Sequence, residues 1–268
     1  TQTWPLETPP VQAVKADFAG DGKSDILWRN TATGQNYLWK DGNSSLGQAL
    51  TTLADLNWKV VGIGDFAGDG KADILWRNTA TGQNYLWKDG NGATGQALTT
   101  LADTNWKVAG IGDFAGDGKA DILWRNSVTG QNYLWKDGNG ATGQTLTTLA
   151  DLNWKVVGIG DFAGDGKADI LWRNSVTGQN YLWKDGNGSL GQTLTTLADT
   201  NWKVVGIGDY AGDGKADILW RNTATGQNYL WKDGNGSLGQ ALTTLADLNW
   251  TVPEQDQTWL NTDGMYGV

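Results

Sequence analysis

The sequence predicts an all-β fold, a β-propeller of four-stranded antiparallel blades, and three observations lead to it. A stretch that reads Asp-Phe-Ala-Gly-Asp-Gly-Lys-Ala-Asp, followed by Ile-Leu-Trp-Arg-Asn, occurs five times with small changes, each copy 48 residues after the last. Short runs of β-branched and aromatic residues alternate with Gly, Asn and Asp, and no long segment has the period of a helix. A fixed period in this range is typical of a repeat protein, and four short strands per unit favour a propeller.

The repeats account for nearly the whole chain, so we expect a single domain over residues 1–268. The last four units differ from one another at only 8 of 48 aligned positions, which indicates recent amplification or deliberate construction. We expect five full blades closed by terminal strands, residues 1–8 and 249–268. The alternative is six blades, with a short sixth blade built from both termini, because Gln257–Asn261 and Met265–Val268 flank a tight Thr-Asp-Gly turn. The repeats are residues 9–56, 57–104, 105–152, 153–200 and 201–248.

Each unit contains four segments with the composition of short strands, separated by turn residues. In the second unit these are residues 59–66, 73–78, 83–88 and 96–102. Alternate loops of such a meander emerge on the same face. We therefore expect the Asp-rich loop to share a face with the turn at 88–91, and the turn at 79–82 to share the other face with the linker at 57–58.

Composition excludes several classes of function. The net charge of −9 and the pI near 4.4 argue against a nucleic-acid partner, which requires clustered basic residues. The chain has no Cys and no His, so disulfides, thiolate chemistry and His-dependent catalysis are absent, and we expect no enzyme. There is no apolar run long enough to span a membrane and no signal peptide at Thr1. We expect a monomer without membrane insertion, extracellular or secreted if the protein is natural.

Three carboxylates recur at positions 1, 5 and 9 of the loop, for example at Asp65, Asp69 and Asp73. Carboxylates brought together repel one another unless a cation lies among them, and Ca²⁺ prefers oxygen ligands of this kind. The backbone carbonyl of Lys71 is a further candidate ligand. The alternative is an acidic turn in which Asp side chains accept backbone N–H groups. The candidate metal ligands are Asp17, Asp21, Lys23, Asp25, Asp65, Asp69, Lys71, Asp73, Asp113, Asp117, Lys119, Asp121, Asp161, Asp165, Lys167, Asp169, Asp209, Asp213, Lys215 and Asp217.

The loop and the Ile-Leu-Trp-Arg-Asn that follows it resemble the FG-GAP/VCBS repeat family, which includes the propellers of integrin α-subunits, and the resemblance covers all five units. It implies a propeller with structural calcium in loops of the form D-x-[DN]-x-D-G-x-x-D. One position departs from this pattern, because the third loop residue is alanine in every copy and supplies no ligand. These alanines are Ala19, Ala67, Ala115, Ala163 and Ala211.

Repeated tryptophans next to Arg and Asn suggest sugar binding, since aromatic rings stack on pyranose faces and polar side chains bond hydroxyls. We expect Trp58, Arg77, Asn78 and Asn84 to converge at each blade junction. The alternative is core packing, which we favour for Trp76, Trp87 and Trp58 and for their repeats. The candidate ligand-binding residues are Trp58, Arg77, Asn78, Asn84, Trp106, Arg125, Asn126, Asn132, Trp154, Arg173, Asn174, Asn180, Trp202, Arg221, Asn222 and Asn228.

The functional hypothesis is a multivalent, lectin-like binding module on a calcium-stabilised propeller. Equivalent sites on one rigid body give avidity even when each site is weak. Two alternatives stay open, a symmetric scaffold with no ligand except calcium, and a propeller that binds another protein.

Overall fold

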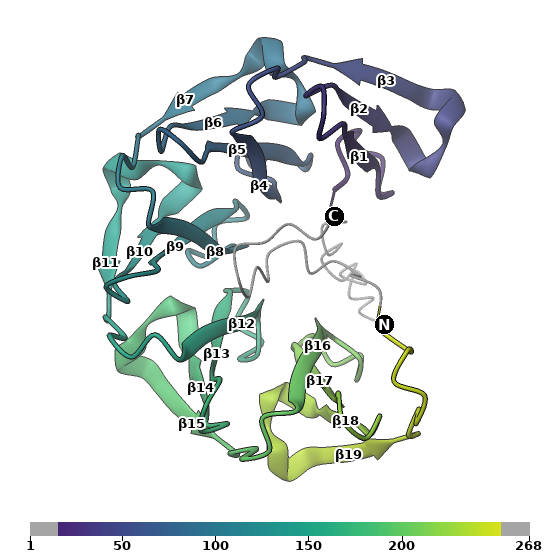
Figure 1. Cartoon of the computed structure of the whole chain (residues 1–268), viewed down its shortest axis with the longest axis vertical. Coiled ribbons are helices and arrows are strands. Elements are labelled where there is room, and N and C mark those ends of the chain that lie inside the picture. The colour runs from purple at the N-terminus through teal and green to yellow at the C-terminus, as the bar shows by residue number, and fades with distance from the viewer. Residues whose placement is uncertain (1–15, 253–268) are drawn as a thin grey trace, which may run out of the picture.

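The computed structural model describes residues 16–252 and shows an all-β fold, as the sequence predicts. The strands of this part of the chain form five antiparallel sheets, one of three strands and four of four strands. Figure 1 shows the sheets side by side in an arc around a central axis, with β4, β8, β12 and β16 closest to the axis and β7, β11, β15 and β19 at the periphery. Each sheet is a blade of a propeller, and the chain runs from the axis outward in each one.

The blades have nearly the same strand bounds. The first is β1 (Ile26–Arg29), β2 (Asn36–Trp39) and β3 (Gly47–Leu50). The second is β4 (Trp58–Gly64), β5 (Asp73–Asn78), β6 (Asn84–Trp87) and β7 (Gln96–Leu98). The third is β8 (Trp106–Gly112), β9 (Asp121–Asn126), β10 (Asn132–Trp135) and β11 (Gln144–Leu146). The fourth is β12 (Trp154–Gly160), β13 (Asp169–Asn174), β14 (Asn180–Trp183) and β15 (Gly191–Leu194), and the fifth is β16 (Trp202–Gly208), β17 (Asp217–Asn222), β18 (Asn228–Trp231) and β19 (Gly239–Leu242).

Two short 3₁₀ turns connect the last two strands of every blade, a feature that the sequence analysis did not predict. They are η1 (Lys40–Gly42) and η2 (Ser44–Leu46), η3 (Lys88–Gly90) and η4 (Gly92–Thr94), η5 (Lys136–Gly138) and η6 (Gly140–Thr142), η7 (Lys184–Gly186) and η8 (Gly188–Leu190), and η9 (Lys232–Gly234) and η10 (Gly236–Leu238).

The predicted strands agree closely with the second blade. The second predicted strand, residues 73–78, is β5 itself, whereas the fourth ends at Leu98 and not at residue 102. Strand β7 ends at Leu98 because the backbone that follows makes hydrogen bonds outside the strand pairing. The side chain of Asn84 donates to the carbonyl of Thr99, and the N–H of Leu101 donates to the carbonyl of Gly82. The first strand also contains a bulge near Val61, where its register with β5 shifts.

The hydrophobic core lies between neighbouring blades. Phe66 and Leu86 of the second blade pack in one cluster with Ile122 and Trp124 of the third, and the last two have no exposed surface. The blades approach so closely that a Cβ atom at Gly64 would lie 2.8 Å from the Cβ of Ala120. Both sides of a blade are therefore apolar, which explains the continuous apolar runs in the sequence.

Two parts of the sequence prediction lie outside the described residues. These are the terminal strands at 1–8 and in the tail beyond residue 252, and the first strand of the first unit. The two predicted loop faces are confirmed: Asp89 N–H bonds the carboxylate of Asp73, and Thr79 N–H bonds the carbonyl of Asn57. Within residues 16–252, no helix has the length and apolarity needed to cross a membrane.

Candidate functional site: the repeated blade junction

The Asp loop of the second blade comprises residues 65–73. Its first aspartate holds the loop together, because the carboxylate accepts hydrogen bonds from backbone N–H groups of the same loop. Asp65 accepts backbone N–H groups from Gly68 at 2.6 Å, Asp69 at 3.2 Å and Gly70 at 2.7 Å. Gly68 and Gly70 have φ angles of 72° and 82°, a backbone conformation in which glycine avoids the strain of a Cβ atom. The loop therefore reverses direction without leaving its donors unpaired.

The last aspartate of the loop is buried and also accepts backbone N–H groups. Asp73 has no exposed surface, and its two oxygens bond Phe66 N at 2.9 Å, Ala67 N at 3.1 Å and Asp89 N at 2.9 Å. This carboxylate joins the Asp loop to the η3 turn of the same blade. Burial raises the pKa of Asp73 to about 6, although the three N–H donors act in the opposite direction.

Each Asp loop also binds the next blade. The carbonyl of Asp65 accepts the N–H of Ala120 at 2.7 Å. The ring of Phe66 would lie 3.3 Å from a Cβ atom at Gly138, and the stem of Lys119 would lie 2.9 Å from one at Gly68. The loop thus fills the junction between two blades.

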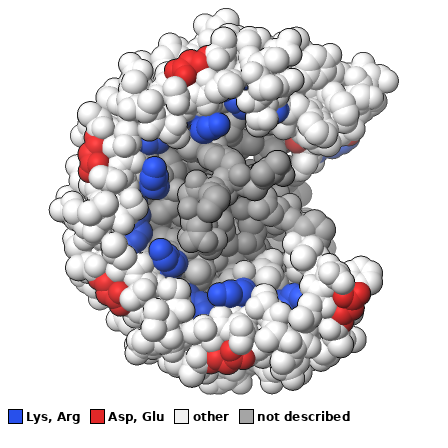
Figure 2. Space-filling model, viewed as in Figure 1, with Lys and Arg blue, Asp and Glu red and all other residues white. Residues whose placement is uncertain are grey.

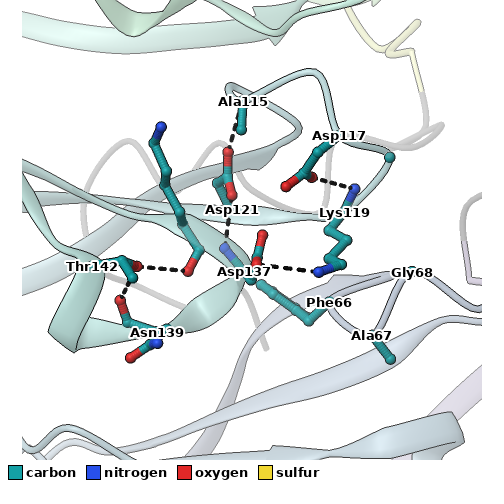
Figure 3. A network of polar contacts seen from close by, with 12 residues as sticks. Phe66, Ala67, Gly68, Ala115, Asp117, Lys119, Asp121, Asp137, Asn139 and Thr142 are labelled. Atoms are coloured by element: carbon teal, nitrogen blue, oxygen red, sulfur yellow. Dashed lines mark hydrogen bonds and ion pairs between the residues drawn. The ribbon is translucent and has the colours of Figure 1, made fainter.

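A lysine and an aspartate of the following blade complete the junction (Figure 3). Lys119 pairs with Asp137 at 3.3 Å, and both side chains are a little over one-third exposed. Asp137 has φ 52°, an uncommon conformation for a non-glycine residue, and its N–H donates to Asp121 at 2.8 Å. Its Oδ1 atom is buried and has no partner among the described residues. The junction therefore brings a charged pair next to a buried carboxylate.

The oxygen atoms of the loop are not arranged to coordinate a calcium ion. Within residues 16–252 no group of three or more acidic side chains is close enough together to hold a metal. The oxygens of Asp65 and Asp73 already accept N–H groups, and Ala67 offers no oxygen at the third loop position. The arrangement is the capped acidic turn that the sequence left open as the alternative to a metal site.

The raised pKa values predict a pH dependence of stability. Burial raises the pKa of Asp73, Asp121 and Asp169 to about 6, above the value of ~3.9 for an unfolded chain. The folded state holds these protons more tightly, so their contribution to stability is complete below about pH 4 and is lost as the pH rises through 6. We expect the melting temperature to fall between pH 4 and pH 7, measured by circular dichroism. The triple Asp→Asn variant serves as control, and a slope as steep as that of the wild type in this variant would contradict the assignment.

A groove of about 280 Å³ lies at the junction between the first and second blades, on the side of the Asp loops. Its lining has two parts. The apolar part is Phe18, Ala19, Leu38 and Leu50, and the polar part is Lys40, Gln48, Lys71, Asp89 and Asn91. Phe18 and Leu38 are buried, so the groove combines a small apolar surface from Ala19 and Leu50 with a larger set of hydrogen-bond donors and acceptors.

The same residue types recur in register at the next three junctions. At the junction of the second and third blades, for example, Lys88, Gln96, Lys119, Asp137 and Asn139 hold the polar positions. Sequence reasoning missed most of this set, naming only Lys71 and its repeats, and those as metal ligands. The available signal was that a lysine, a glutamine and an asparagine follow the third strand at fixed positions in every unit.

Three of the residues predicted to bind ligand have structural roles in the blade. Arg77 is buried, and its guanidinium donates to the carbonyls of Gly82 and Leu101 and to Asn84 Oδ1. Asn78 caps the turn that follows it and donates to Asp55 at 2.8 Å. These polar groups are used within the protein, so ligand binding stays a prediction only for the tryptophans of the set. Equivalent contacts hold Arg125, Asn126, Asn132, Arg173, Asn174, Asn180, Arg221, Asn222 and Asn228.

Arg77 also connects its blade to the next one, because the flat guanidinium group stacks on a tryptophan ring of that blade. The guanidinium of Arg77 lies 5.0 Å from the ring centroid of Trp124 in the next blade. Burial lowers the pKa of Arg77 to about 10, a value at which it keeps its charge at neutral pH. Trp58, the remaining predicted ligand residue, is half-buried and makes an edge contact with Tyr85 at 6.4 Å.

Charge is distributed radially on the molecule. Figure 2 shows Lys and Arg along the inner rim of the arc and Asp and Glu at its outer edge on the face in view. Pairing of β4 with β5 places Lys59 directly opposite Arg77, which puts two cations side by side close to the axis. The net charge of −9 is thus not spread evenly over the surface.

Four overlapping matches to the FG-GAP-like repeat model cover residues 17–76, 65–124, 113–172 and 161–220. The chain therefore belongs to the FG-GAP-like repeat family. Comparison with curated protein sequences gave no match.

Solved propeller structures show the same fold. One is a nidogen/laminin complex, with 14% identity and a TM-score of 0.50 over 81% of this chain and 77% of that chain. Another is virginiamycin B lyase from Staphylococcus aureus, with 8% identity and a TM-score of 0.54 over 82% of this chain and 67% of that chain. At these identities the likeness concerns the fold alone.

Proposed function

We propose that this FG-GAP-like protein is a non-enzymatic, multivalent binding module that takes carbohydrate in its junction grooves. The observation that carries the proposal is the groove of about 280 Å³ at the first junction, whose lining residues recur in register at three more junctions. A catalytic centre usually depends on residues that occur once, whereas every residue of this groove has counterparts in the other units. The repetition supports several equal sites.

The chemistry of the groove suits a sugar. Pyranose rings have apolar faces and hydroxyl edges, so they bind where apolar side chains lie next to groups that both donate and accept hydrogen bonds. Ala19 and Leu50, which are half-buried, supply the apolar part, and Lys40, Gln48 and Asn91 supply the polar part. Gln48 is exposed and makes no side-chain hydrogen bond within the described residues, so its amide is available to a ligand.

Each site is expected to be weak, because Lys71 and Asp89 of the groove are each 38% exposed to solvent. A rigid disc with four such sites gains affinity for a multivalent glycan through effective concentration, without any strong single contact. A protein partner is the alternative ligand. We propose that the protein is an extracellular monomer when it binds either the glycan or the protein partner.

A groove variant with a matched control tests this proposal. The groove variant replaces Gln48, Gln96, Gln144 and Gln192 with alanine; the control replaces Gln35, Gln83, Gln131 and Gln179, glutamines of the turns on the opposite face. Each lost hydrogen bond is worth about 0.5–1.5 kcal/mol. Across four sites we expect at least about a tenfold loss of binding to a glycan array for the groove variant only. Equal binding by both variants, or a blank array with wild-type protein, would refute the groove as a sugar site.

Calcium in the Asp loops stays a prediction of the family resemblance, and we propose instead that backbone N–H groups suffice to stabilise the loops. A site filled at ~100 times its dissociation constant would add about 2.7 kcal/mol of stability. We expect the melting temperature in millimolar calcium and in excess chelator to agree. A rise of several degrees with calcium would show that the loops rearrange around a cation.

A further inference from the structure

The innermost strand of each of the last four blades carries a single charged residue, and that residue is a lysine. Strands β4, β12 and β16 read Trp-Lys-Val-Val-Gly-Ile-Gly, and β8 differs only in one alanine. The lysine lies near the beginning of the strand, whereas the Asp loop follows the strand's other end. These strands are the ones closest to the axis in Figure 1, so their lysines line the axis on the face opposite the Asp loops. We call them the axial lysines, and they are Lys59, Lys107, Lys155 and Lys203.

Each axial lysine lies directly opposite an arginine of the neighbouring strand. The pairs are Lys59 with Arg77, Lys107 with Arg125, Lys155 with Arg173 and Lys203 with Arg221. The arginines are buried, whereas the lysines are half-buried or exposed. Like charges that face each other across two antiparallel strands destabilise the sheet. The pairing therefore lowers the stability of four blades unless an anion balances the charge.

No acidic side chain among residues 16–252 forms an ion pair with these cations. The axial lysines also make no side-chain hydrogen bond in this part of the chain. The guanidinium of Arg77 donates to backbone carbonyls and to the amide oxygen of Asn84, which are neutral acceptors. Asp103 attracts Arg77 without pairing with it, because its carboxylate accepts the N–H of Asn105 and the side-chain amide of Asn126. The positive charge near the axis is thus available to a ligand.

The same face carries acidic residues farther from the axis. One aspartate lies in the linker after each outermost strand, and Asp55 accepts the side chain of Asn78 at the turn that defines this face. Figure 2 shows basic residues along the inner rim and acidic residues at the outer edge. An extended polyanion such as a nucleic-acid duplex would cross the acidic edge and be repelled there. A compact anion reaches the lysines without that contact. The linker aspartates are Asp55, Asp103, Asp151, Asp199 and Asp247.

The type of cation indicates the type of anion. Planar arginine groups bind carboxylates through two parallel hydrogen bonds, but the arginines here already donate to groups within the protein. The lysines offer ammonium groups, which bind phosphate as point charges from several directions. The arrangement favours an anion with several phosphate groups over a carboxylate.

We propose that the axial lysines bind a compact anion with several phosphate groups, at the axis on the face opposite the Asp loops. One such molecule contacts ammonium groups from more than one blade and offsets the repulsion between each lysine and its opposing arginine. This site is separate from the junction groove, which Lys71 and Asp89 line on the other face. Binding here therefore does not depend on the carbohydrate proposal, and each can fail without the other.

Titration calorimetry with tripolyphosphate at low ionic strength tests the proposal on the full-length protein. The axial variant combines Lys59→Gln, Lys107→Gln, Lys155→Gln and Lys203→Gln. We expect wild-type protein to bind the anion and the axial variant to bind it at least about tenfold more weakly, because several charge pairs are lost together. We expect both proteins to bind equally to a glycan array, since the junction grooves are unchanged.

The matched control changes the net charge by the same amount away from the axis. It combines Thr52→Glu, Thr100→Glu, Thr148→Glu and Thr196→Glu, at exposed positions that follow the outermost strands. We expect its affinity to stay within about threefold of wild type, because solvent and salt screen these distant charges. An equal loss in both variants would overturn the proposal, since net charge alone would then explain binding. No binding by wild-type protein, or tighter binding to a short DNA duplex than to tripolyphosphate, would overturn it as well.

A thermal melt separates binding from folding. Without the anion, the axial variant should melt at the same temperature as wild type or higher, because four like-charge pairs are removed. Tripolyphosphate should raise the melting temperature of wild type and not that of the axial variant, since a ligand of the folded state stabilises it. A markedly lower melting temperature for the anion-free variant would show that the lysines stabilise the fold itself, and would contradict the proposal.

Discussion

Replacing Trp124 with alanine is expected to lower the free energy of unfolding by about 3–5 kcal/mol. Trp124 has no exposed surface and lies in the cluster between the second and third blades. Its ring is 5.0 Å from that of Trp135 and 5.0 Å from the guanidinium of Arg77. The variant therefore leaves a cavity and removes the partner of a buried cation, and chemical denaturation measures the loss.

The control is Leu190→Ala, since Leu190 is 52% exposed and its side chain borders no junction cluster. We expect this change to stay within about 0.5 kcal/mol. A loss of less than about 1 kcal/mol for Trp124→Ala would mean that the blades do not depend on the core between them.

The second large effect is expected for Asp121→Ala in the Asp loop of the third blade. The Asp121 carboxylate accepts N–H groups from Phe114 at 2.9 Å, Ala115 at 3.0 Å and Asp137 at 2.8 Å. Removing the acceptor leaves buried donors unpaired, at about 1–3 kcal/mol each where water cannot replace it. We expect a loss of at least about 3 kcal/mol by the same denaturation measurement.

Asp117→Ala is the control within the same loop. Asp117 is exposed and its carboxylate accepts only the N–H of Lys119, at 3.0 Å, so its removal should change stability little. If a cation held the loop together, the two aspartates would matter equally. An equal loss for both variants would therefore contradict the capped-loop account.

Much of the fold could be predicted from one unit of the sequence. The segment that reads Asp-Ile-Leu-Trp-Arg-Asn is a strand with the predicted ends, because turn residues flank it on both sides and its apolar run is uninterrupted. The 3₁₀ turns were not predicted, since they depend on Asp89 in a left-handed conformation and on Asn91 accepting the N–H of Ala93. Such local hydrogen bonds compete with strand continuation and leave no periodicity to detect.

The site was predicted less well, because its side chains contact residues that are distant in the sequence. Arg77 is an arginine at the end of an apolar strand, and sequence alone favours a solvated strand end or a ligand contact. Its actual partners, Trp124 and the carbonyl of Leu101, lie 47 and 24 residues away in the chain. Periodic sequence shows that such contacts repeat but not which residues meet. The groove residues Lys40 and Gln48 were missed for the same reason, because they face a junction that exists only between units.

Binding to a glycan surface at two densities tests the central claim, that equal sites at the blade junctions act together. Dissociation of wild-type protein from a dense surface should be at least about 100-fold slower than from a sparse one, because several grooves engage at once. The groove variant with its four glutamines replaced should lose most of this difference. Dissociation that is the same at both densities, or an absence of binding to either surface, would contradict the claim.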